Sequence, residues 1–545
     1  MEEEQIKMPN ILVNEYMWQA FRKTFSETQK QQEENFIKNL GDNIKYVNML
    51  NGTVFNFSSQ GFRYINKNEA KNELISNILA VPIKKYDFKT EEETKSNIEI
   101  KGFLSPTGEE LPSIIIPIKQ IETGNWFVNS LWGFKARFKL PAQKAIQIDA
   151  LKELSKNMEE ETIYQYTGFS EIDGKKVFLY VGGAIGIEKD VKVDLGDENL
   201  NRFTLTTKSF NIKDTLKLSL ACLDVAPAII TTPIVALTFM SPLTSTFEEL
   251  GIPLGILTWV QGPMHCLKTS MVSAICSHFG NFNKNHSPMS FLDGIPSAKE
   301  KSAKCKDVLV LCDDYFPSSN KQEVAEMNKF TENLISSYSD KMTGTRSKSN
   351  GDMRKTYRAK GQVIATGELF PDLSQSRMSR VLFVNVNKSD IKDKKLKNIQ
   401  NHPEELQYTT RKYLEYLIYN SEMIKSEIPM IFEAKTQEAS KEVTFRTAEM
   451  LAGLYIGYYY LIDFCVTNNV ITPEKKEEML QDSWNTLIAL GKEQNTLVET
   501  VSPINMFLSA AEVLTNTGKL STFDYASAKS TKMRDIMQDG FIRFL

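Results

Sequence analysis

The sequence predicts an α/β protein with a β-rich N-terminal part and an all-helical C-terminal part, and three observations carry this prediction. Short apolar runs in the middle of the chain, such as residues 254–260 and 308–311, end in glycine-containing or acidic loops. Such runs are typical of buried strands in a sheet covered on both faces. Segments of alternating polarity precede them, and helical patterns follow from residue 406. This succession of element types indicates the fold class.

In the N-terminal part, helical spacing within residues 1–45 predicts a first helix. Strand patterns follow at residues 96–100, 114–118 and 176–181, the last after a turn at Asp173-Gly174. A charged stretch over residues 146–161 is expected to form a helix that interrupts the strands. Two more helices, over residues 213–223 and 227–240, are expected to lead into the central strands.

The C-terminal part is expected to begin with a lysine-rich linker over residues 387–397. Apolar periodicity then predicts helices over residues 406–423, 439–468, 473–494 and 503–516. The run Thr472-Pro473-Glu474 is a typical helix start, because threonine caps a helix and proline fits its first turn.

A phosphate-binding loop is predicted directly after the apolar run 254–260. The pattern is a glycine, four positions of any residue type, and then Lys-Thr at the start of a helix. Its main-chain N–H groups and its lysine bind phosphates, and its threonine hydroxyl binds Mg²⁺. One position departs from this pattern, because Leu267 stands where the second glycine is usual; the alternative is an ordinary helix start. The residues expected to hold the phosphates of ATP are Gly262, Pro263, Met264, His265, Cys266, Leu267, Lys268, Thr269 and Ser270.

A pair of acids follows the apolar run 308–311, about forty residues downstream of the loop. Asp313, together with Thr269, is expected to hold Mg²⁺, and Asp314 is expected to polarise the attacking water. The alternative is a buried strand that merely ends in a polar turn.

Polar residues near two later strands complete the candidate site. Thr366 and Glu368 end the apolar run after Gly361 and could sense the γ-phosphate. Arg377 and Arg380 precede the strand pattern 381–386, where an arginine could reach the nucleotide of a neighbouring subunit; such an arginine contributes roughly 10³–10⁵ in rate in GTPases. The alternative for either arginine is a surface salt bridge.

A basic segment over residues 341–360 is the candidate DNA-binding element. It carries one acid, Asp352, and seven cations, so its net charge is +6. A hairpin with its turn at Asn350-Gly351 is expected, and it would bind DNA through the phosphates. The alternative is a solvated surface loop. The cations are Lys341, Arg346, Lys348, Arg354, Lys355, Arg358 and Lys360.

Taken together and in order, these motifs resemble one family over about residues 90–520. The motifs are the phosphate loop, Lys306-Asp307 with the acid pair, Gly344-Thr345-Arg346, the strand ending Thr366-Gly367-Glu368, and Gln375 to Arg380, with Thr167-Gly168-Phe169 and residues 182–186 upstream. The family is a domain-of-unknown-function family of phage, plasmid and genomic-island replicative helicases, similar to minichromosome-maintenance AAA+ ATPases and including the self-loading helicases of staphylococcal islands and cassettes. Its usual Thr-Gly-Trp is Thr-Gly-Phe in this chain.

The resemblance implies a P-loop AAA+ ATPase core that hydrolyses ATP with Mg²⁺ between the subunits of a homo-hexameric ring. The basic segment would face the central pore and track single-stranded or forked DNA during replication of a mobile element or phage. The expected regions are a mixed helical region over residues 1–85, a β-rich N-terminal domain over 86–212, the ATPase domain over 213–390 and a helical domain over 391–545.

Two other functions fit the same residues. One is an NTPase of anti-phage defence that shares the core without processive unwinding. The other is a catalytically weak DNA-binding platform, in which Leu267 makes the phosphate loop degenerate. ATPase measurements with and without single-stranded DNA would separate the platform from the helicase, and unwinding of forked duplexes would separate the helicase from the defence NTPase.

Composition narrows the possible partners and the compartment. The net charge is −3, so any nucleic acid must meet a local basic patch. The six cysteines form no C-x-x-C pair, which is typical of reduced thiols in a cytoplasmic protein. The acidic start argues against a signal peptide, the apolar stretch 451–462 is too short to span a bilayer, and prolines interrupt residues 225–247, so no membrane partner is expected.

Overall fold

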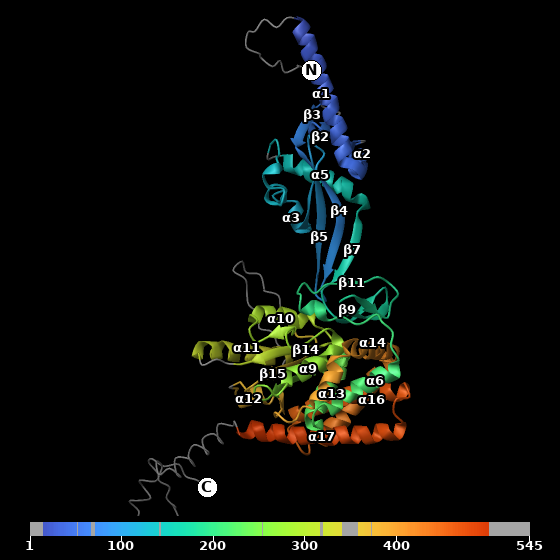
Figure 1. Cartoon of the computed structure of the whole chain (residues 1–545), viewed down its shortest axis with the longest axis vertical. Coiled ribbons are helices and arrows are strands. Elements are labelled where there is room, and N and C mark those ends of the chain that lie inside the picture. Colours follow the sequence, from blue (N-terminus) through green and yellow to red (C-terminus); the bar gives the residue numbers. More distant parts are fainter. Residues whose placement is uncertain are drawn as a thin grey trace, which may run out of the picture. The chain divides into compact units, whose positions relative to one another are not determined.

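The chain divides into two compact units, Met1–Tyr164 and Gln165–Leu545 (Figure 1). The computed structural model describes residues 15–51, 53–66, 71–140, 143–252, 254–316, 320–339, 358–371 and 373–500. The division into two units is coarser than the four regions expected from the sequence, and the boundaries of those regions remain predictions. The helix expected over residues 503–516 lies outside the described residues.

Unit 1 contains strands of two sheets, in which most neighbours are antiparallel, and several helices. β1, β2 and β3 form one sheet; in the other, β4, β5 and β6 are antiparallel neighbours and β7 runs parallel to β4. Its elements are α1 (Glu15–Leu40), α2 (Ile44–Asn51), β1 (Phe55–Ser58), β2 (Gly61–Asn66), β3 (Lys71–Ser76), β4 (Ile78–Lys89), β5 (Thr94–Leu104), β6 (Glu110–Pro117), α3 (Ile118–Ile121), α4 (Trp126–Asn129), α5 (Lys144–Leu154) and β7 (Glu159–Tyr164).

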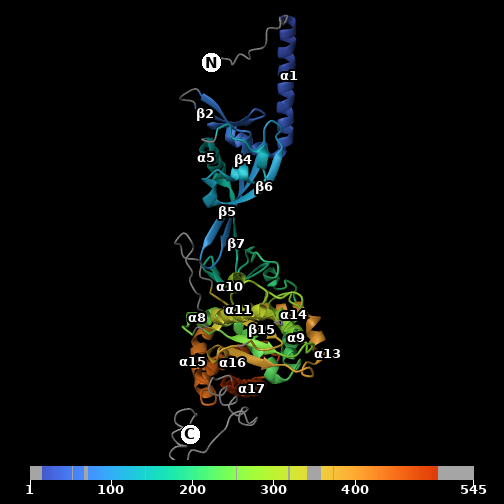
Figure 2. The ribbon, with the colours of Figure 1, turned by 90° about the vertical axis from the view of Figure 1, so that its left-hand side faces the viewer.

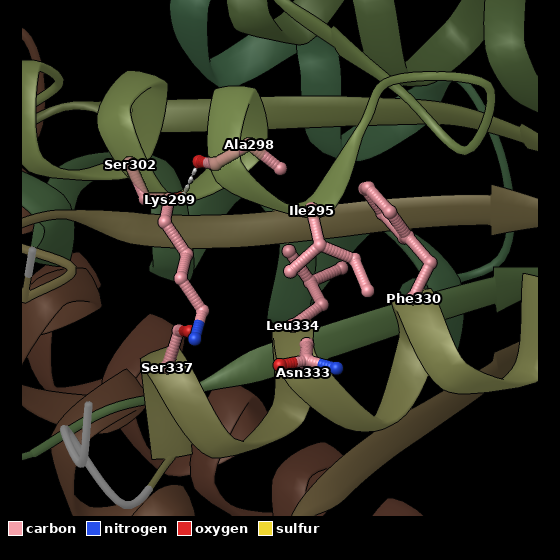
Figure 3. A pocket seen from close by; sticks show the side chains of 8 residues that line it. All are labelled: Ile295, Ala298, Lys299, Ser302, Phe330, Asn333, Leu334 and Ser337. Carbon is pink, nitrogen blue, oxygen red and sulfur yellow. Dashed lines mark hydrogen bonds between the residues drawn. The ribbon is translucent and has the colours of Figure 1, made fainter. Parts of the chain in front are cut away.

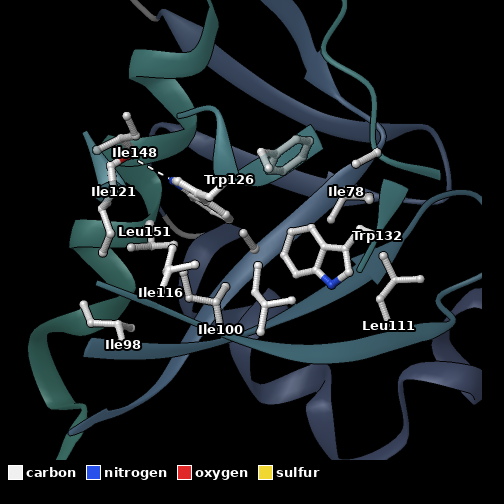
Figure 4. Close-up of a cluster of buried hydrophobic side chains, with 14 residues drawn as sticks. Ile78, Ile98, Ile100, Leu111, Ile116, Ile121, Trp126, Trp132, Ile148 and Leu151 are labelled. Atoms are coloured by element: carbon white, nitrogen blue, oxygen red, sulfur yellow. Dashed lines mark hydrogen bonds between the residues drawn. The ribbon is translucent and has the colours of Figure 1, made fainter. Parts of the chain in front are cut away.

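One face of the β4–β5–β6 sheet is covered by a cluster of buried aromatic and aliphatic side chains (Figure 4). Trp126 and Trp132 lie at its centre, and each indole N–H is satisfied inside the protein, by the carbonyl oxygens of Ile121 and Pro112. Gly102 on β5 is required there, because a Cβ atom would lie 2.8 Å from the Trp132 ring. Burial of such large rings provides much of the stability of this unit.

The charged stretch 146–161 does not form one helix, which corrects the expectation from the sequence. α5 ends at Leu154, and the acidic residues after Met158 form β7. Cross-strand ion pairs explain the change, because Glu161 lies 3.2 Å from Lys84 and Glu160 lies 3.2 Å from Lys85 on the parallel neighbour β4. Glu160 lies directly opposite Lys85 and Glu161 lies diagonal to Lys84, and opposite charges at such positions favour the pairing of strands.

Unit 2 contains a small antiparallel sheet, β10-β9-β8, and a five-stranded parallel sheet in the order β13-β14-β15-β12-β16. Its strands are β8 (Gly168–Ile172), β9 (Lys175–Tyr180), β10 (Gly183–Ile185), β11 (Lys192–Val193), β12 (Leu257–Gln261), β13 (Met289–Ser290), β14 (Leu309–Tyr315), β15 (Gln362–Gly367) and β16 (Val381–Asn385). The sequence predicts four strands of the parallel sheet; β13, which has only two residues, gives no pattern that could be recognised.

The order of the parallel strands determines where their loops meet. β15 lies between β12 and β14, so the loops that follow these three strands are neighbours at the carboxyl edge of the sheet. Ligands of open α/β sheets bind at this edge, where the chain order of the strands changes direction. The opposite, amino edge is formed by the residues that precede the same strands.

Helices surround the parallel sheet and fill the C-terminal part of unit 2. They are α6 (Ile212–Ala221), α7 (Ala228–Met240), α8 (Thr244–Glu249), α9 (Lys268–Cys276), α10 (Ile295–Lys304), α11 (Lys321–Ser339), α12 (Gln375–Met378), α13 (Asp393–Gln400), α14 (Pro403–Tyr419), α15 (Ser421–Ala439), α16 (Phe445–Thr467) and α17 (Pro473–Thr500). α16 packs against α7, α15 and α17, and in Figures 1 and 2 α16 and α17 lie together below β15. The mixed α/β character and the helical C-terminal region expected from the sequence are confirmed.

Three predictions for the C-terminal part need correction. The helix expected over residues 406–423 ends at Tyr419, and a separate helix, α15, begins at Ser421. The expected linker over residues 387–397 contains the start of α13. The helix expected from residue 439 begins only at Phe445, because Thr444 has extended main-chain angles and its side chain caps the helix by accepting from the Thr447 N–H.

Two helical stretches, Ala228–Glu249 and Phe445–Thr467, have the length and composition of a membrane span, but most of each is buried inside the unit, as in core helices. All six cysteines are unpaired and buried.

Candidate active site

The loop between β12 and α9 begins at a glycine that no other residue could replace. A Cβ atom on Gly262 would lie 2.4 Å from the Val386 carbonyl oxygen. The Gly262 N–H donates to the Gly367 carbonyl oxygen at 3.2 Å, which ties the loop to the end of β15. Pro263, Met264 and His265 are exposed, whereas Cys266 is buried beneath them. The loop therefore presents its outer side to solvent at the carboxyl edge of the sheet.

Leu267 adopts the main-chain conformation that glycine would adopt at this position. Its φ of 63° and ψ of 15° are left-handed, and it is the residue immediately before α9. A left-handed conformation costs a residue with a Cβ atom about 1–2 kcal/mol. The Leu267 side chain is 39% exposed, so it projects outward from the loop. The departure from the glycine pattern thus changes a side chain on the surface while the main chain still turns into α9.

Lys268 is the first residue of α9 and is only 9% exposed. Among the residues that the structure describes, its ammonium group has no ion pair and no hydrogen bond. Lysine is rarely buried without a partner, because the charge loses its hydration. The start of a helix adds unsatisfied N–H groups and the positive end of the helix dipole. The site therefore favours an anion at this point.

The side chains of Thr269, Asp313 and Thr366 meet where β12, β14 and β15 end. The Thr269 hydroxyl donates to Asp313 Oδ1 at 2.9 Å, and the Thr366 hydroxyl donates to the same oxygen. The two hydroxyl oxygens are 3.4 Å apart. Burial raises the pKa of Asp313, and the hydrogen bonds from both threonines oppose this rise.

A carboxylate and a hydroxyl fit Mg²⁺, which keeps several waters and is completed by substrate phosphates rather than by an all-protein cage. The described part of the chain contains no group of three or more His, Cys, Asp or Glu side chains placed to hold a metal.

Asp314 and Glu368 lie beside this cluster and are more open to solvent. Asp314 is exposed, has a left-handed φ of 69°, and its N–H donates to the Thr366 hydroxyl at 3.4 Å. The Glu368 N–H donates to the Tyr315 carbonyl oxygen at 3.3 Å, which places this half-buried acid directly after β15. Residues 313, 314, 366 and 368 are thus neighbours at one edge, as their positions after parallel strands predict.

Arg377 and Arg380 do not lie beside the phosphate loop of their own chain. They directly precede β16, and Val381 at its start pairs with Leu257 at the start of β12. A five-residue strand, about 16 Å long, therefore separates them from the carboxyl edge. Arg377 donates to the Ser336 hydroxyl of α11. Action on the nucleotide of a neighbouring subunit remains a prediction.

Most of the basic segment lies outside the described residues, which include only two of its seven cations. Lys341, Arg346, Lys348, Arg354 and Lys355 are outside; Arg358 is exposed and Lys360 is half-buried. The flanks of the segment are described: the Ser339 hydroxyl at the end of α11 donates to the Arg380 carbonyl oxygen at 2.9 Å, and β15 begins at Gln362. Both flanks therefore lie at the amino edge, opposite the phosphate loop.

Two hollows elsewhere lack the character of an active site. A hollow between α10 and α11, lined by Ile295, Ala298, Lys299, Ser302, Phe330, Asn333, Leu334 and Ser337, has a volume of about 10 Å³, room for no more than one water (Figure 3). An open hollow of about 380 Å³ in unit 1, lined by Ile116, Gln120, Thr123, Asn125, Trp126 and Ser130, has no ionisable side chain.

One polar residue beside the site, Gln261, is not predicted from the sequence. Gln261 ends β12 directly before Gly262, and its side-chain oxygen is buried with no hydrogen-bond partner among the described residues. A buried amide oxygen without a partner is costly. The only signal in the sequence was a polar residue after an apolar run, which is common at strand ends.

Comparisons with known proteins show which fold the chain has. A search of protein-family models finds no match, and no curated protein matches. Among solved structures, the SCCmec type IV Cch, described as an active helicase, is similar with a TM-score of 0.54 and 13% identity, over 88% of this chain and 85% of that one. The C-terminal region of NrS-1 aligns with a TM-score of 0.23 and 10% identity, over 76% of this chain and 88% of that one. The chain thus shares its fold with the Cch helicase.

Proposed function

We propose that this protein is an ATP-dependent DNA helicase that binds Mg-ATP at the carboxyl edge of the parallel sheet. The observation that carries the proposal is Lys268, a buried cation without a described partner at the start of α9, beside the Thr269–Asp313 pair. A phosphate chain would supply the missing negative charge. The fold shared with the Cch helicase supports the same conclusion.

Each residue of the site then has a distinct task. The main-chain N–H groups of the loop 262–270, except at Pro263, and the Lys268 ammonium would bind the phosphates, and Thr269 and Asp313 would hold Mg²⁺. Mg²⁺ held by these two residues would neutralise charge on the transferred phosphoryl group. Asp314 is exposed beside Asp313 and would orient the attacking water. We assign the sensing of the γ-phosphate to Thr366, which accepts from the Asp314 N–H, and to Glu368.

DNA is expected at the opposite edge of the sheet. Both described flanks of the basic segment 341–360 lie at the amino edge, away from the proposed nucleotide site. We propose that this segment binds the phosphates of single-stranded or forked DNA without sequence preference, as charge-driven contacts do. Arg377 and Arg380 lie at the same edge, away from the nucleotide of their own chain. We therefore propose that they reach the nucleotide of a neighbouring subunit in a ring, a homo-hexamer. This ring would act in the replication of a mobile element or phage.

Leu267 does not argue for an inactive platform. The residue keeps the left-handed conformation before α9, and its side chain projects outward, so the Lys268 position is retained.

Unwinding of a forked duplex tests the proposal. With ATP and Mg²⁺, the wild-type chain is expected to separate the strands, and Lys268→Ala is expected to abolish separation because the phosphates lose their cation. Lys217→Ala is the matched control, since Lys217 is an exposed lysine that pairs, among the described residues, with Asp214 on its own helix. A wild-type chain that does not separate the strands under conditions where it binds forked DNA would contradict the helicase function.

A further inference from the structure

The motifs Thr167-Gly168-Phe169 and Lys306-Asp307 have no role in the proposed ATP site, and they are hydrogen-bonded to each other. Residues 165–169, here called the connector, are the first residues of unit 2 after the chain leaves unit 1 at Tyr164. The Thr167 N–H donates to the Lys304 carbonyl oxygen at 2.9 Å, and its hydroxyl donates to the Lys306 carbonyl oxygen at 2.9 Å. The connector is thus bound to the turn that precedes β14.

Both main-chain groups of Phe169 are held by consecutive side chains of that turn. The Lys306 ammonium donates to the Phe169 carbonyl oxygen at 2.6 Å, and the Phe169 N–H donates to Asp307 Oδ2 at 2.9 Å. The approach is so close that only glycine fits at position 168, where a Cβ atom would lie 2.6 Å from the Lys306 carbonyl oxygen. Gly168 also has a left-handed φ of 97°.

Asp307 is the centre of this arrangement and is completely buried. Besides the Phe169 N–H, it accepts from the N–H and the hydroxyl of Ser245 on α8, both at 2.8 Å. Burial raises the pKa of Asp307 to about 6 although these hydrogen bonds and Lys306 oppose the rise. Its φ of 55° is left-handed, a conformation that persists only where surrounding contacts fix it. Burying a carboxylate costs free energy, which indicates that the relative position of the segments it joins is important.

The position of Asp307 links three parts of the chain. It lies two residues before β14, whose other end carries Asp313 and Asp314, about 20 Å away along the strand. Its own N–H donates at 3.2 Å to the carbonyl oxygen of Lys360, the last residue of the basic segment. One residue therefore contacts the connector, α8 and the root of the basic segment at the far end of the strand that bears the acid pair.

We propose that Asp307 is a positioning residue that couples the nucleotide site to the connector and to the basic segment, with β14 as the rigid link between them. A change in the position of Asp313 between the nucleotide-free and nucleotide-bound states moves β14, and the Asp307 bonds move the connector and Lys360 with it. The proposal rests on the proposed function, because it requires nucleotide at the carboxyl edge. Asp307 itself contacts neither nucleotide nor metal.

The test uses the full-length chain and follows hydrogen exchange of the Phe169 amide with and without Mg²⁺ and a slowly hydrolysed ATP analogue. In the wild type, exchange at this amide is expected to change when the analogue binds. In Asp307→Asn the NH₂ group cannot accept a hydrogen bond, so at least one bond to Phe169 or Ser245 is lost whichever way the amide is turned, and the remaining bonds go to an uncharged group. The exchange change at the Phe169 amide is expected to shrink, and unwinding is expected to fall about tenfold, the effect of losing one hydrogen bond to a charged group. Basal ATP hydrolysis stays within about twofold.

Ser245→Ala provides a milder variant that keeps the carboxylate and removes one donor, and a smaller loss of unwinding in the same direction is expected. Ser241→Ala is the matched control, because it removes a buried hydroxyl nearby that donates to the Leu237 carbonyl oxygen in the preceding helix and, among the described residues, has no bond to Asp307 or the connector. It is expected to leave both readouts unchanged.

The outcomes separate the two proposals. A wild-type chain that fails to bind the analogue contradicts the proposed function as well. A wild-type chain that binds it without any change at the Phe169 amide contradicts the coupling alone. The coupling is also overturned if Ser245→Ala and Asp307→Asn lower basal hydrolysis and unwinding in parallel, because that pattern indicates a merely structural role.

Discussion

The two edges of the parallel sheet differ in how their polar groups are satisfied. At the carboxyl edge, Lys268 has no described partner, Asp314 is exposed, and Leu267 and Asp314 hold left-handed conformations. At the amino edge, Asp307 and Gln362 are completely buried and each makes three side-chain hydrogen bonds. Polar groups without internal partners favour reversible binding of a ligand, and polar groups satisfied by internal hydrogen bonds favour a fixed structure. The difference assigns nucleotide binding to the carboxyl edge, and it assigns to the amino edge a fixed frame from which the basic segment begins and ends.

The largest effect is expected at the carboxyl edge with Asp314→Asn. The substitution keeps the size of the side chain but removes the charge that orients the attacking water, so turnover should fall about 10²–10⁴-fold. Nucleotide affinity should change little, because Lys268 and the loop are intact. Single-turnover hydrolysis together with equilibrium nucleotide binding measures both. Loss of binding in parallel with turnover would show that Asp314 belongs to the phosphate-binding set instead.

Substitutions at the amino edge should lower the stability of the fold, whereas Asp314→Asn at the carboxyl edge should lower turnover. The Gln362 side chain accepts from the Ile256 N–H at 2.7 Å and donates to Thr244 and to the Leu254 carbonyl oxygen. Gln362→Ala leaves these buried groups without partners, so the free energy of unfolding should fall by about 3 kcal/mol. Denaturant unfolding measures it, and Gln322→Ala on the exposed start of α11 is the control. A loss below about 1 kcal/mol would contradict the difference between the edges.

The pH dependence of stability tests the buried acid of the amino edge. The pKa of Asp307 is raised from 3.8 to about 6 in the folded chain, so folding favours its protonated form. The resulting stabilisation is complete below pH 4 and is lost as the pH rises through 6, in total about 3 kcal/mol. Asp307→Asn removes this titration. The difference in unfolding free energy between wild type and variant should therefore shift between pH 4 and 7, and a constant difference would show that Asp307 is not buried as described.

The smallest effect is expected from Leu267→Gly. Glycine adopts the left-handed conformation at no steric cost, so the relief of strain and the greater freedom of the unfolded chain nearly offset each other. Stability should change by no more than about 1 kcal/mol, and hydrolysis should be retained. Leu267→Val is the contrasting variant, because a β-branched residue is most strained there. Loss of hydrolysis in Leu267→Gly would show that the leucine side chain itself contacts the nucleotide.

The sequence predicts the carboxyl edge better than the amino edge, for a physical reason. The loop 262–270, Asp313 and Thr366 each follow an apolar run, and parallel strands bring such residues together wherever their carboxyl ends meet. Asp307 carries no comparable signal, because its burial depends on Phe169 and Ser245, which are distant in the sequence. β7 is not recognisable from local patterns, because its acidic residues pair with lysines of β4 that are distant in the sequence. The distance of Arg377 and Arg380 from the loop follows from strand direction, which local patterns do not contain.

The most direct test of the separate roles of the two edges is steady-state ATP hydrolysis with and without single-stranded DNA. The wild type should hydrolyse ATP and be stimulated by DNA, Lys268→Ala should lose both activities, and an Arg354→Ala, Lys355→Ala double variant of the basic segment should keep basal hydrolysis and lose the stimulation. Wild-type hydrolysis no higher than that of Lys268→Ala, with or without DNA, would contradict the account.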